Sequence, residues 1–359
     1  MNKSLSSHAT HYWHALSDGR VQCDVCPHQC QLQEGQRGLC YVRGCENGQV
    51  VLYSYARSSG FCIDPIEKKP LNHFLPGTPV LSFGTAGCNL SCKFCQNWDM
   101  SKSRQMDTLA SQASPQQLAQ ACVANGCRAI AYTYNDPVIF MEYAIDVAQA
   151  CHAEGIYSVA VSAGYILPAA RERFFHFMDA TNIDLKGFNE HFYRRLCGGH
   201  LQPVLETLIY LVHETDCWVE ITNLIIPGEN DDPAEIEAMC EWIHDQLGAL
   251  IPLHFSAFHP DYKLQQIPPT TRQSLENARQ IALNCGLKHV YTGNIAALTS
   301  NSTFCSQCGL CLIERHQYQL GNWNLDAKGR CRRCQTPLAG RFEASPGHWG
   351  ARRQPLKIS

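Results

Sequence analysis

The chain has 359 residues, 45% of them hydrophobic, and a formal net charge of −3 at pH 7. This length allows one large domain of about 250 residues with smaller attachments, and the hydrophobic content is enough to build its core. Because the net charge is small and negative, the chain lacks the basic field that attracts nucleic acid by neutralising phosphates, and we expect no nucleic-acid partner.

The N-terminal residues and the cysteine content both indicate a cytoplasmic location. Residues 1–19 contain no apolar stretch that resembles a signal peptide, and no run is apolar enough to span a bilayer, so no membrane association is expected. The cytoplasm keeps thiols reduced, so the 21 cysteines are not expected to form disulfides, and those that cluster are expected to bind metal. Scattered cysteines, interpreted as small buried hydrophobic residues, are Cys122, Cys127, Cys151, Cys217, Cys240 and Cys285.

Three cysteine-rich stretches divide the chain into four predicted segments. An N-terminal cysteine module spans residues 1–60, and the main domain spans 61–298. A second cysteine module covers 299–345 and is followed by a basic tail, 346–359. The tail is interpreted as solvated rather than as a binding arm. Its basic residues are Arg352, Arg353 and Lys357.

Short apolar strands alternate with helices in the main domain. The first helix is well marked, with Ser114 as its N-cap and Pro115 at the first helical position. The predicted strands are 80–87, 129–135, 157–163, 180–185, 218–227, 253–258 and 289–294. The predicted helices are 114–126, 137–154, 231–248 and 271–286, with one more before 180 and another before 218.

Strands this apolar, each separated from the next by a helix, predict a parallel sheet that is covered on both faces. About six such repeats can close, or nearly close, into a barrel. We therefore expect an α/β fold, a partial (β/α)6-type TIM barrel, with an N-terminal cysteine module and a C-terminal zinc-ribbon-like module.

The first cysteine group has C-x2-C-x3-C-x9-C spacing and consists of Cys23, Cys26, Cys30 and Cys40. Four thiolates make a closed metal site, and thiolate suits both zinc and iron–sulfur clusters. The spacing therefore leaves zinc and an auxiliary 4Fe–4S cluster open. It also leaves open whether Cys45 takes the place of Cys40.

The second group lies in GCNLSCKFCQNWDMS, residues 87–101, where Cys88, Cys92 and Cys95 have C-x3-C-x2-C spacing. Three thiolates leave one coordination position open, which is a property of catalytic rather than structural metal centres. The loop follows a predicted strand, at the barrel rim where chemistry is done. The alternative is a zinc or electron-transfer site that takes its fourth ligand from elsewhere in the chain.

Polar residues gather at the C-terminal ends of the later predicted strands. These candidates are Asn135, Asp136, Ser162, Asp184, Lys186, Thr222, Asn223, His254 and His259. The Lys186 ammonium suits a carboxylate or a developing negative charge, and Asp136 or Asp184 suits an ammonium or hydroxyl donor. The alternatives are an ordinary Asp184–Lys186 ion pair and rim histidines with no role in a site.

The third group has two C-x2-C knuckles separated by 22 residues, and consists of Cys305, Cys308, Cys331 and Cys334. This is the spacing of a zinc ribbon, in which tetrahedral thiolate coordination fixes a segment too small to bury its own core. Cys311 competes with Cys305 as a ligand, and iron bound as in rubredoxin is the alternative metal. The expected role is structural.

The C-x3-C-x2-C loop after the first strand, with Phe94 just before its last cysteine, resembles the radical S-adenosylmethionine (SAM) superfamily. The resemblance implies that Cys88, Cys92 and Cys95 hold a 4Fe–4S cluster whose fourth iron is chelated by S-adenosylmethionine. It also implies that an electron from the cluster breaks a carbon–sulfur bond of the cofactor. The resulting deoxyadenosyl radical abstracts hydrogen from a substrate.

Longer motifs narrow the resemblance. The motifs AYTYNDP, IDLKGF, LIIPGENDD, LHFSAFHPDYK and VYTGN look like those of AmmeMemoRadiSam-system radical enzymes, which are related to pyruvate formate-lyase activating enzymes. The resemblance implies cofactor contacts from Phe94, Asn135, Asp136, Ser162, Asp184, Lys186, Asn223 and His254, with Lys186 and the three cysteines as catalytic residues. Tyr134-Asn135-Asp136 stands where the relatives bind the cofactor's ammonium, and Thr222 stands where they have an arginine.

The resemblance implies an activating-enzyme-like radical enzyme that acts on a polypeptide. It implies flavodoxin or ferredoxin as a reductant, and Memo-type and Amme-type proteins as partners. Two other classes of function are an electron carrier and a protein-binding module without radical chemistry. A binding module does not explain why the middle cysteine group has three ligands at a barrel rim.

Overall fold

The computed structural model describes residues 7–105, 109–295 and 300–358. Its centre is a nine-stranded sheet with the strand order β16-β15-β14-β13-β12-β11-β9-β8-β20. Strands β9 to β16 are parallel and lie in chain order, whereas β8 pairs antiparallel with β9. The strands are β8 (Phe61–Pro65), β9 (Pro79–Phe83), β11 (Ala129–Tyr132), β12 (Tyr157–Ser162), β13 (Ala180–Asp184), β14 (Trp218–Ile225), β15 (Leu253–Ala257), β16 (Val290–Gly293) and β20 (Gln354–Leu356).

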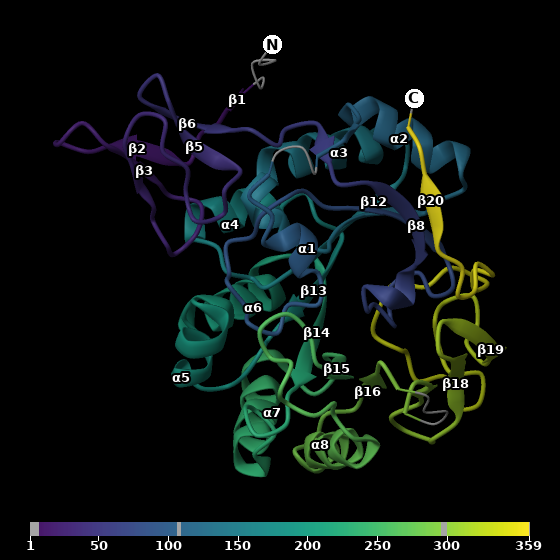
Figure 1. Ribbon diagram of the computed structural model, residues 1–359. Coiled ribbons are helices and arrows are strands. Elements are labelled where there is room, and N and C mark those ends of the chain that lie inside the picture. The colour runs from purple at the N-terminus through teal and green to yellow at the C-terminus, as the bar shows by residue number, and fades with distance from the viewer. Residues whose placement is uncertain (1–6, 106–108, 296–299, 359) are drawn as a thin grey trace.

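Helices connect successive parallel strands, as the alternating sequence pattern predicted. They are α1 (Trp98–Ser101), α2 (Pro115–Ala124), η3 (Pro137–Phe140), α3 (Met141–Ala153), α4 (Pro168–Phe175), α5 (Glu190–Phe192), η4 (Tyr193–Cys197), α6 (Gln202–Glu214), α7 (Pro233–Leu247) and α8 (Arg272–Asn284). The predicted N-cap is confirmed, because the Ser114 side chain accepts a hydrogen bond from Gln117 N in a capping box. Figure 1 shows the helices along the outer side of the curved sheet.

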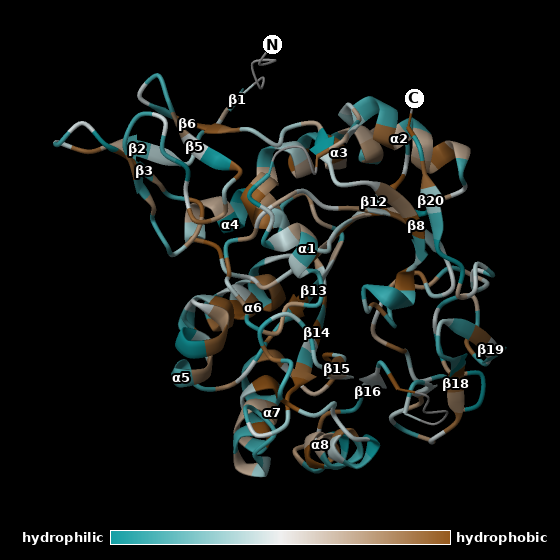
Figure 2. Ribbon diagram, in the orientation of Figure 1, coloured by the Kyte–Doolittle hydropathy of each residue, from teal (hydrophilic) through white to brown (hydrophobic). Residues whose placement is uncertain are grey.

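Both faces of the sheet are covered, but by different kinds of structure. Figure 2 shows hydrophobic residues concentrated in the strands and hydrophilic residues along the outer helices. The inner face is filled at its N-terminal end by the segment 66–75, which includes η1 (Ile66–Lys68). There Ile66, Leu71 and Phe74 pack on small strand residues such as Ala131. The C-terminal end of the inner face is left for a cavity.

The N-terminal cysteine module consists of two small antiparallel sheets, ordered β1-β6-β5 and β2-β3-β4. It lies at the left of Figure 1, beside α4. Its strands are β1 (His8–Ala9), β2 (Trp13–Ala15), β3 (Val21–Cys23), β4 (Gln31–Leu32), β5 (Arg43–Glu46) and β6 (Gln49–Leu52). A further pair, β7 (Arg57–Ser58) with β10 (Ser111–Gln112), links the module to the main domain.

The C-terminal module contains the antiparallel sheet β17 (Thr303–Phe304), β18 (Cys311–His316) and β19 (Gln319–Trp323). It packs on the segment 72–78 of the main domain. Arg315, which is buried, donates to the carbonyl of Asn72, and the backbone amide of Arg341 donates to the carbonyl of His73. The predicted boundary at 298/299 lies outside the described residues.

Within the predicted tail, residues 346–359, the basic residues Arg352, Arg353 and Lys357 are exposed, but one short stretch joins the main sheet. Residues 354–356 form β20, which pairs antiparallel with β8 at the edge of the main sheet. The backbone groups at the free edge of β8 need partners, and the tail supplies them. As a result Arg353 lies beside the buried carboxylate of Asp64. Among the described helices, none is long and apolar enough to cross a membrane.

Candidate active site and metal centres

The three-cysteine loop follows β9 and is held by Asn135, which lies just after β11. The Asn135 side chain accepts a hydrogen bond from Thr85 N (3.1 Å) and donates to the carbonyl of Gly87 (2.8 Å). The side chain is therefore occupied by the loop itself. Asn135 fixes the backbone from which Cys88 extends, a role that the sequence resemblance did not predict.

The loop rests on the π-helical turn η4, far along the chain. The amide of Ser91 donates to the carbonyl of Cys197 (2.8 Å), and a Cβ at Gly198 would lie 2.0 Å from Ser91 Oγ. Glycine is thus required at 198, where φ is +69°. Phe94 is buried against the ring of Phe192, with centroids 5.8 Å apart. It packs the loop onto the last residue of α5, directly before η4.

Cys197 was missed by sequence reasoning, which did not include it in any cysteine group. Its side chain hydrogen-bonds to Cys92 and lowers the pKa of the Cys92 thiol to about 6. The charge of Lys186 acts in the same direction. A thiolate is the form that binds iron, so this environment suits a ligand. The signal in the sequence was the pair of glycines that follows Cys197, because Gly198 and Gly199 indicate that another segment packs closely there.

Asp136 is buried at the start of η3, and its carboxylate accepts three hydrogen bonds. The donors are Ser162 Oγ (2.9 Å), Ala163 N (2.9 Å) and Val138 N (3.1 Å). Burial raises the pKa of Asp136 despite these donors. The predicted candidates Asp136 and Ser162 are therefore in direct contact, and together they tie the end of β11 to the end of β12.

Asp184 and Lys186 form an ion pair at the end of β13, with Lys186 Nζ 2.8 Å from Asp184 Oδ2. Burial opposes the charge on Lys186, but the Asp184 carboxylate and the Cys92 thiol outweigh it and hold the pKa of Lys186 well above its usual value. The backbone of Lys186 is fixed by Tyr193 Oη and by Asn230. The charged end of Lys186 thus lies between Asp184 and the cysteine loop.

A cavity of about 950 Å3 lies on the inner face of the sheet. Asp184, Thr222 and His254, from three successive strands, line it. Thr222 Oγ1 is buried and has no hydrogen-bond partner among the residues that the structure describes. His254 Nε2 is 2.6 Å from Glu220 Oε2. Burial alone would raise the pKa of Glu220, but the hydrogen bond and charge of His254 lower it to about 2.

Two candidates lie away from this cavity. Asn223 is on the opposite face of β14, where its amide donates to the carbonyl of Leu185 (2.7 Å) and contacts Met239 of α7. His259 is exposed in the loop after β15. The structure brings Asp136, Ser162, Asp184 and Lys186 together with the cysteine loop, but not these two.

Residues 83–243 match the family model described as the Radical SAM superfamily. The uncharacterized protein MJ0808 of Methanocaldococcus jannaschii is 39% identical over 324 residues, which are 90% of this chain and 96% of that protein. The chain belongs to the radical SAM superfamily. The benzylsuccinate synthase activating enzyme of Thauera aromatica is 28% identical over 126 residues, 34% of this chain and 38% of that enzyme.

Solved structures of radical SAM proteins are also similar. A domain of the pyruvate-formate lyase-activating enzyme of Bacteroides vulgatus is 17% identical, with a TM-score of 0.41, over 46% of this chain and 98% of that one. A radical SAM methyltransferase of Sphaerobacter thermophilus is 16% identical, with a TM-score of 0.49, over 61% of this chain and 67% of that one.

The residues of this radical SAM chain fit the cluster and cofactor that the superfamily implies. Cys88, Cys92 and Cys95 supply three thiols on one loop. Beside them lie a cation, Lys186, and a cavity that contains the unpartnered hydroxyl of Thr222. Among the described residues, these cysteines do not form a group whose sulfurs all lie within 4.8 Å of one another. A single metal ion would require such a group, whereas the thiolates of a cube bind different irons.

Cys62, Lys69 and Tyr134 also line the cavity, and they belong to a buried polar cluster around Asp64 that sequence reasoning missed. Tyr134 Oη donates to Asp64 Oδ2 (2.8 Å) and contacts Cys62 Sγ (2.6 Å). Lys69 Nζ is 2.9 Å from Asp64 Oδ2, and both side chains are almost fully buried. Tyr134 reaches Asp64 from a left-handed backbone conformation, with φ of +73°. Residues 62–69 lie on the antiparallel strand β8 and the turn after it, so their place in the sheet was not predictable from the parallel pattern.

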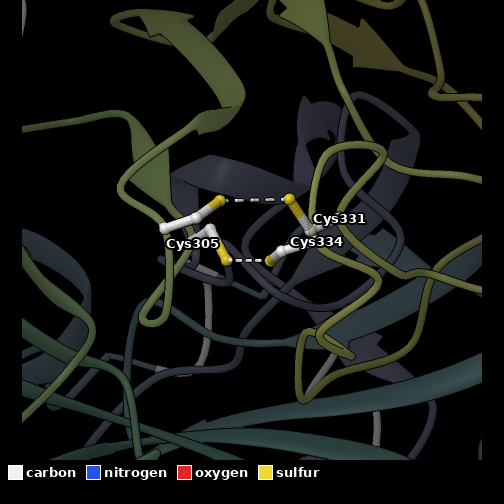
Figure 3. A group of neighbouring side chains, drawn as sticks. Cys305, Cys331 and Cys334 are labelled. Carbon is white, nitrogen blue, oxygen red and sulfur yellow. Dashed lines mark hydrogen bonds between the residues drawn. The ribbon is translucent and has the colours of Figure 1, made fainter.

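The four cysteines of the C-terminal module converge as their spacing predicted. Cys305 Sγ is 3.5 Å from Cys334 Sγ, and Cys308 Sγ is 3.6 Å from Cys331 Sγ (Figure 3). All four sulfurs lie within 4.8 Å of one another, as the ligands of one metal ion must. Cys311 is outside this group. We call these four residues the C-terminal tetrad.

The four N-terminal cysteines lie around one small space. They line a cavity of about 20 Å3, and they are Cys23, Cys26, Cys30 and Cys40. Cys45 is elsewhere in the module, where its sulfur contacts Glu34 Oε2 (3.6 Å). The structure therefore favours Cys40 over Cys45 as the fourth member.

Proposed function

We propose that this radical SAM protein reductively cleaves S-adenosylmethionine and uses the resulting 5'-deoxyadenosyl radical to abstract hydrogen from a substrate. The observation that carries the proposal is the three-thiol loop beside Lys186, next to a polar cavity of about 950 Å3 that Gln96 and Asn97 of the loop and Asp184 line. When bound, a 4Fe–4S cluster would supply the electron, and S-adenosylmethionine would supply the radical. An electron carrier or a protein-binding module has no need for a cavity of this size.

The chain's own residues hold and orient these groups. Cys88, Cys92 and Cys95 are the cluster ligands. Lys186 pairs with the carboxylate of the cofactor, and Asp184 supports that cation and accepts hydrogen bonds from the cofactor.

Asp136, with Ser162, is the proposed contact for the cofactor's ammonium. The contacts that hold Asn135, Asn223 and Phe94 support positioning roles for them in place of the predicted cofactor contacts.

His254 and Thr222 lie deeper in the cavity and are proposed to contact the cofactor or the substrate. The sequential strand order supports the partial TIM barrel expected from the sequence. In such a barrel the cavity is reached at the C-terminal ends of the strands, next to the cysteine loop. A polypeptide segment is the proposed substrate class, as in an activating enzyme.

The AmmeMemoRadiSam motifs support Memo-type and Amme-type proteins as partners. Flavodoxin or ferredoxin is the proposed reductant, since cleavage requires one electron for each cofactor. All 21 cysteines are free thiols in the structure, which supports a reducing compartment such as the cytoplasm.

The test is an anaerobic assay of the iron-reconstituted chain with S-adenosylmethionine and dithionite. We expect 5'-deoxyadenosine and methionine in equal amounts. With deuterated candidate partner proteins, deuterium should appear in the deoxyadenosine when the true substrate is present. A reconstituted, cluster-containing chain that forms no deoxyadenosine above the level without protein would refute the proposal.

We further propose zinc as the metal of the C-terminal tetrad. Replacing Cys305 and Cys308 together by serine in the full chain should remove one zinc, measured by elemental analysis. It should also lower the midpoint of thermal unfolding, because metal binding largely supplies the folding energy of such a module. The matched control is Cys311→Ser, which removes a thiol of the same module that lies outside the tetrad. Unchanged zinc content in the double variant contradicts the assignment.

A further inference from the structure

The N-terminal cysteines differ from the C-terminal tetrad in the separation of their sulfurs. Zinc holds its thiolates about 2.3 Å from the ion, so the sulfurs of a tetrahedral site lie about 3.8 Å apart. The tetrad has this geometry, with sulfur pairs at 3.5 and 3.6 Å. Among the described residues, the N-terminal cysteines do not form a compact ligand group of this kind.

The N-terminal sulfurs nevertheless surround one space. All four thiols line the cavity of about 20 Å3, which exceeds the roughly 10–15 Å3 that one water needs. This space is small for a 4Fe–4S cube. The arrangement of the sulfurs is therefore the stronger indication of whether they bind one ion or a cluster. Thiols that line one space without forming a compact ligand group fit four irons better than one ion.

The N-terminal cysteines are also next to the catalytic loop. The carbonyl of Cys40 packs on Gly87, so closely that a Cβ at Gly87 would lie 1.9 Å from it. Cys88 follows directly in the chain. A second contact joins His28 Nε2 to the carbonyl of Asn89, at 2.7 Å. The N-terminal cysteines and the catalytic cysteine loop are thus joined by direct contacts between neighbouring residues.

The surroundings suit a charged cluster close to the surface. Arg43 lines the cavity, and both it and its ion-pair partner Glu142 are buried. Leu39 also lines the cavity and is 41% exposed, although it is a large hydrophobic residue. The site is therefore closed toward the sheet and close to solvent on its other side, where a protein reductant can approach.

We propose that Cys23, Cys26, Cys30 and Cys40 hold an auxiliary 4Fe–4S cluster that passes electrons to the catalytic cluster. A one-electron reductant of the flavodoxin or ferredoxin class reduces the auxiliary cluster. With both clusters bound, the auxiliary cluster would pass the same electron to the cluster that Cys88, Cys92 and Cys95 would hold, and would return to its oxidised state. The relay rests on the proposed function, but the presence of the cluster does not.

The first experiment measures iron without using activity. The full chain with Cys88, Cys92 and Cys95 replaced by alanine, reconstituted anaerobically, should keep about four irons and four sulfides. Its reduced form should give the electron paramagnetic resonance signal of one 4Fe–4S cluster. A variant that also has Cys23→Ala and Cys26→Ala should lose both. The proposal would be overturned if the triple variant bound zinc in place of iron. It would also be overturned if the variant with Cys23→Ala and Cys26→Ala added still bound iron.

The second experiment tests the relay in the chain with all catalytic cysteines intact. Cys23→Ala with Cys26→Ala should lower deoxyadenosine formation at least tenfold when a flavodoxin system supplies electrons. Dithionite, which is small enough to reach the catalytic cluster itself, should restore most of the rate. Cys45→Ala is the matched control and should behave as the unchanged chain. Equal rates with flavodoxin in the double variant and the unchanged chain refute the relay, whereas failure of the unchanged chain with both reductants refutes the proposed function.

Discussion

A chain in which Cys88, Cys92 and Cys95 are all replaced by alanine is expected to form no 5'-deoxyadenosine. The three thiols are the ligands of the catalytic cluster, and without them no iron is placed to bind the cofactor. The measurement is chromatography of the nucleoside products after anaerobic incubation with S-adenosylmethionine and dithionite. Because the effect is total rather than partial, this variant gives the largest change that the structure predicts.

Two controls separate loss of the cluster from loss of the fold. The first control replaces three other buried cysteines by alanine, namely Cys122, Cys127 and Cys151. It removes the same number of thiols and leaves the cysteine loop unchanged. That variant should retain deoxyadenosine formation, as should Cys197→Ala, which removes the thiol beside Cys92 but no proposed ligand. If the loop variant still cleaves the cofactor, the catalytic assignment is wrong.

The regular part of the fold was predictable because local signals agreed with the global arrangement. Ser114 caps its helix, the apolar strands lie where they were expected, and the polar residues at their ends face one cavity at Asp184 and His254. The C-terminal tetrad was predictable for a different reason. Paired knuckles of fixed spacing place four thiols around one ion whatever the rest of the chain does.

Other features depend on contacts between distant residues and had no local signal. Thr222 and Asn223 are adjacent residues of one strand and point to opposite faces of the sheet. Because both faces are covered and both residues are buried, the sequence does not indicate which of the two faces the cavity. The strand β20 exists because the edge of β8 offers free backbone groups, and nothing in the composition of 346–359 indicates that pairing. The contact between Cys92 and Cys197 likewise depends on how η4 packs under the loop.

Lys186 is the residue at which an ordinary ion pair and a cofactor contact make different predictions. Its Nζ already forms an ion pair with Asp184, and its charge also lowers the pKa of the Cys92 thiol. If the ammonium binds the cofactor's carboxylate, Lys186→Ala removes a charge-assisted hydrogen bond worth about 1.5–3 kcal/mol. Affinity for S-adenosylmethionine should then fall roughly ten- to a hundredfold, while the absorbance of the cluster is unchanged.

Isothermal titration of the anaerobic, cluster-loaded protein measures this affinity directly. Lys186→Arg should restore only part of it, since a planar guanidinium does not replace a compact ammonium in a fixed pocket. Lys288→Ala, at an exposed position far along the chain, is the matched control for loss of one positive charge. If Lys186 serves only as a partner of Asp184, its removal lowers stability alone, because it leaves a partly buried carboxylate without its partner. Affinity for the cofactor would then equal that of the Lys288 control, and Lys186 would be excluded from the cofactor site.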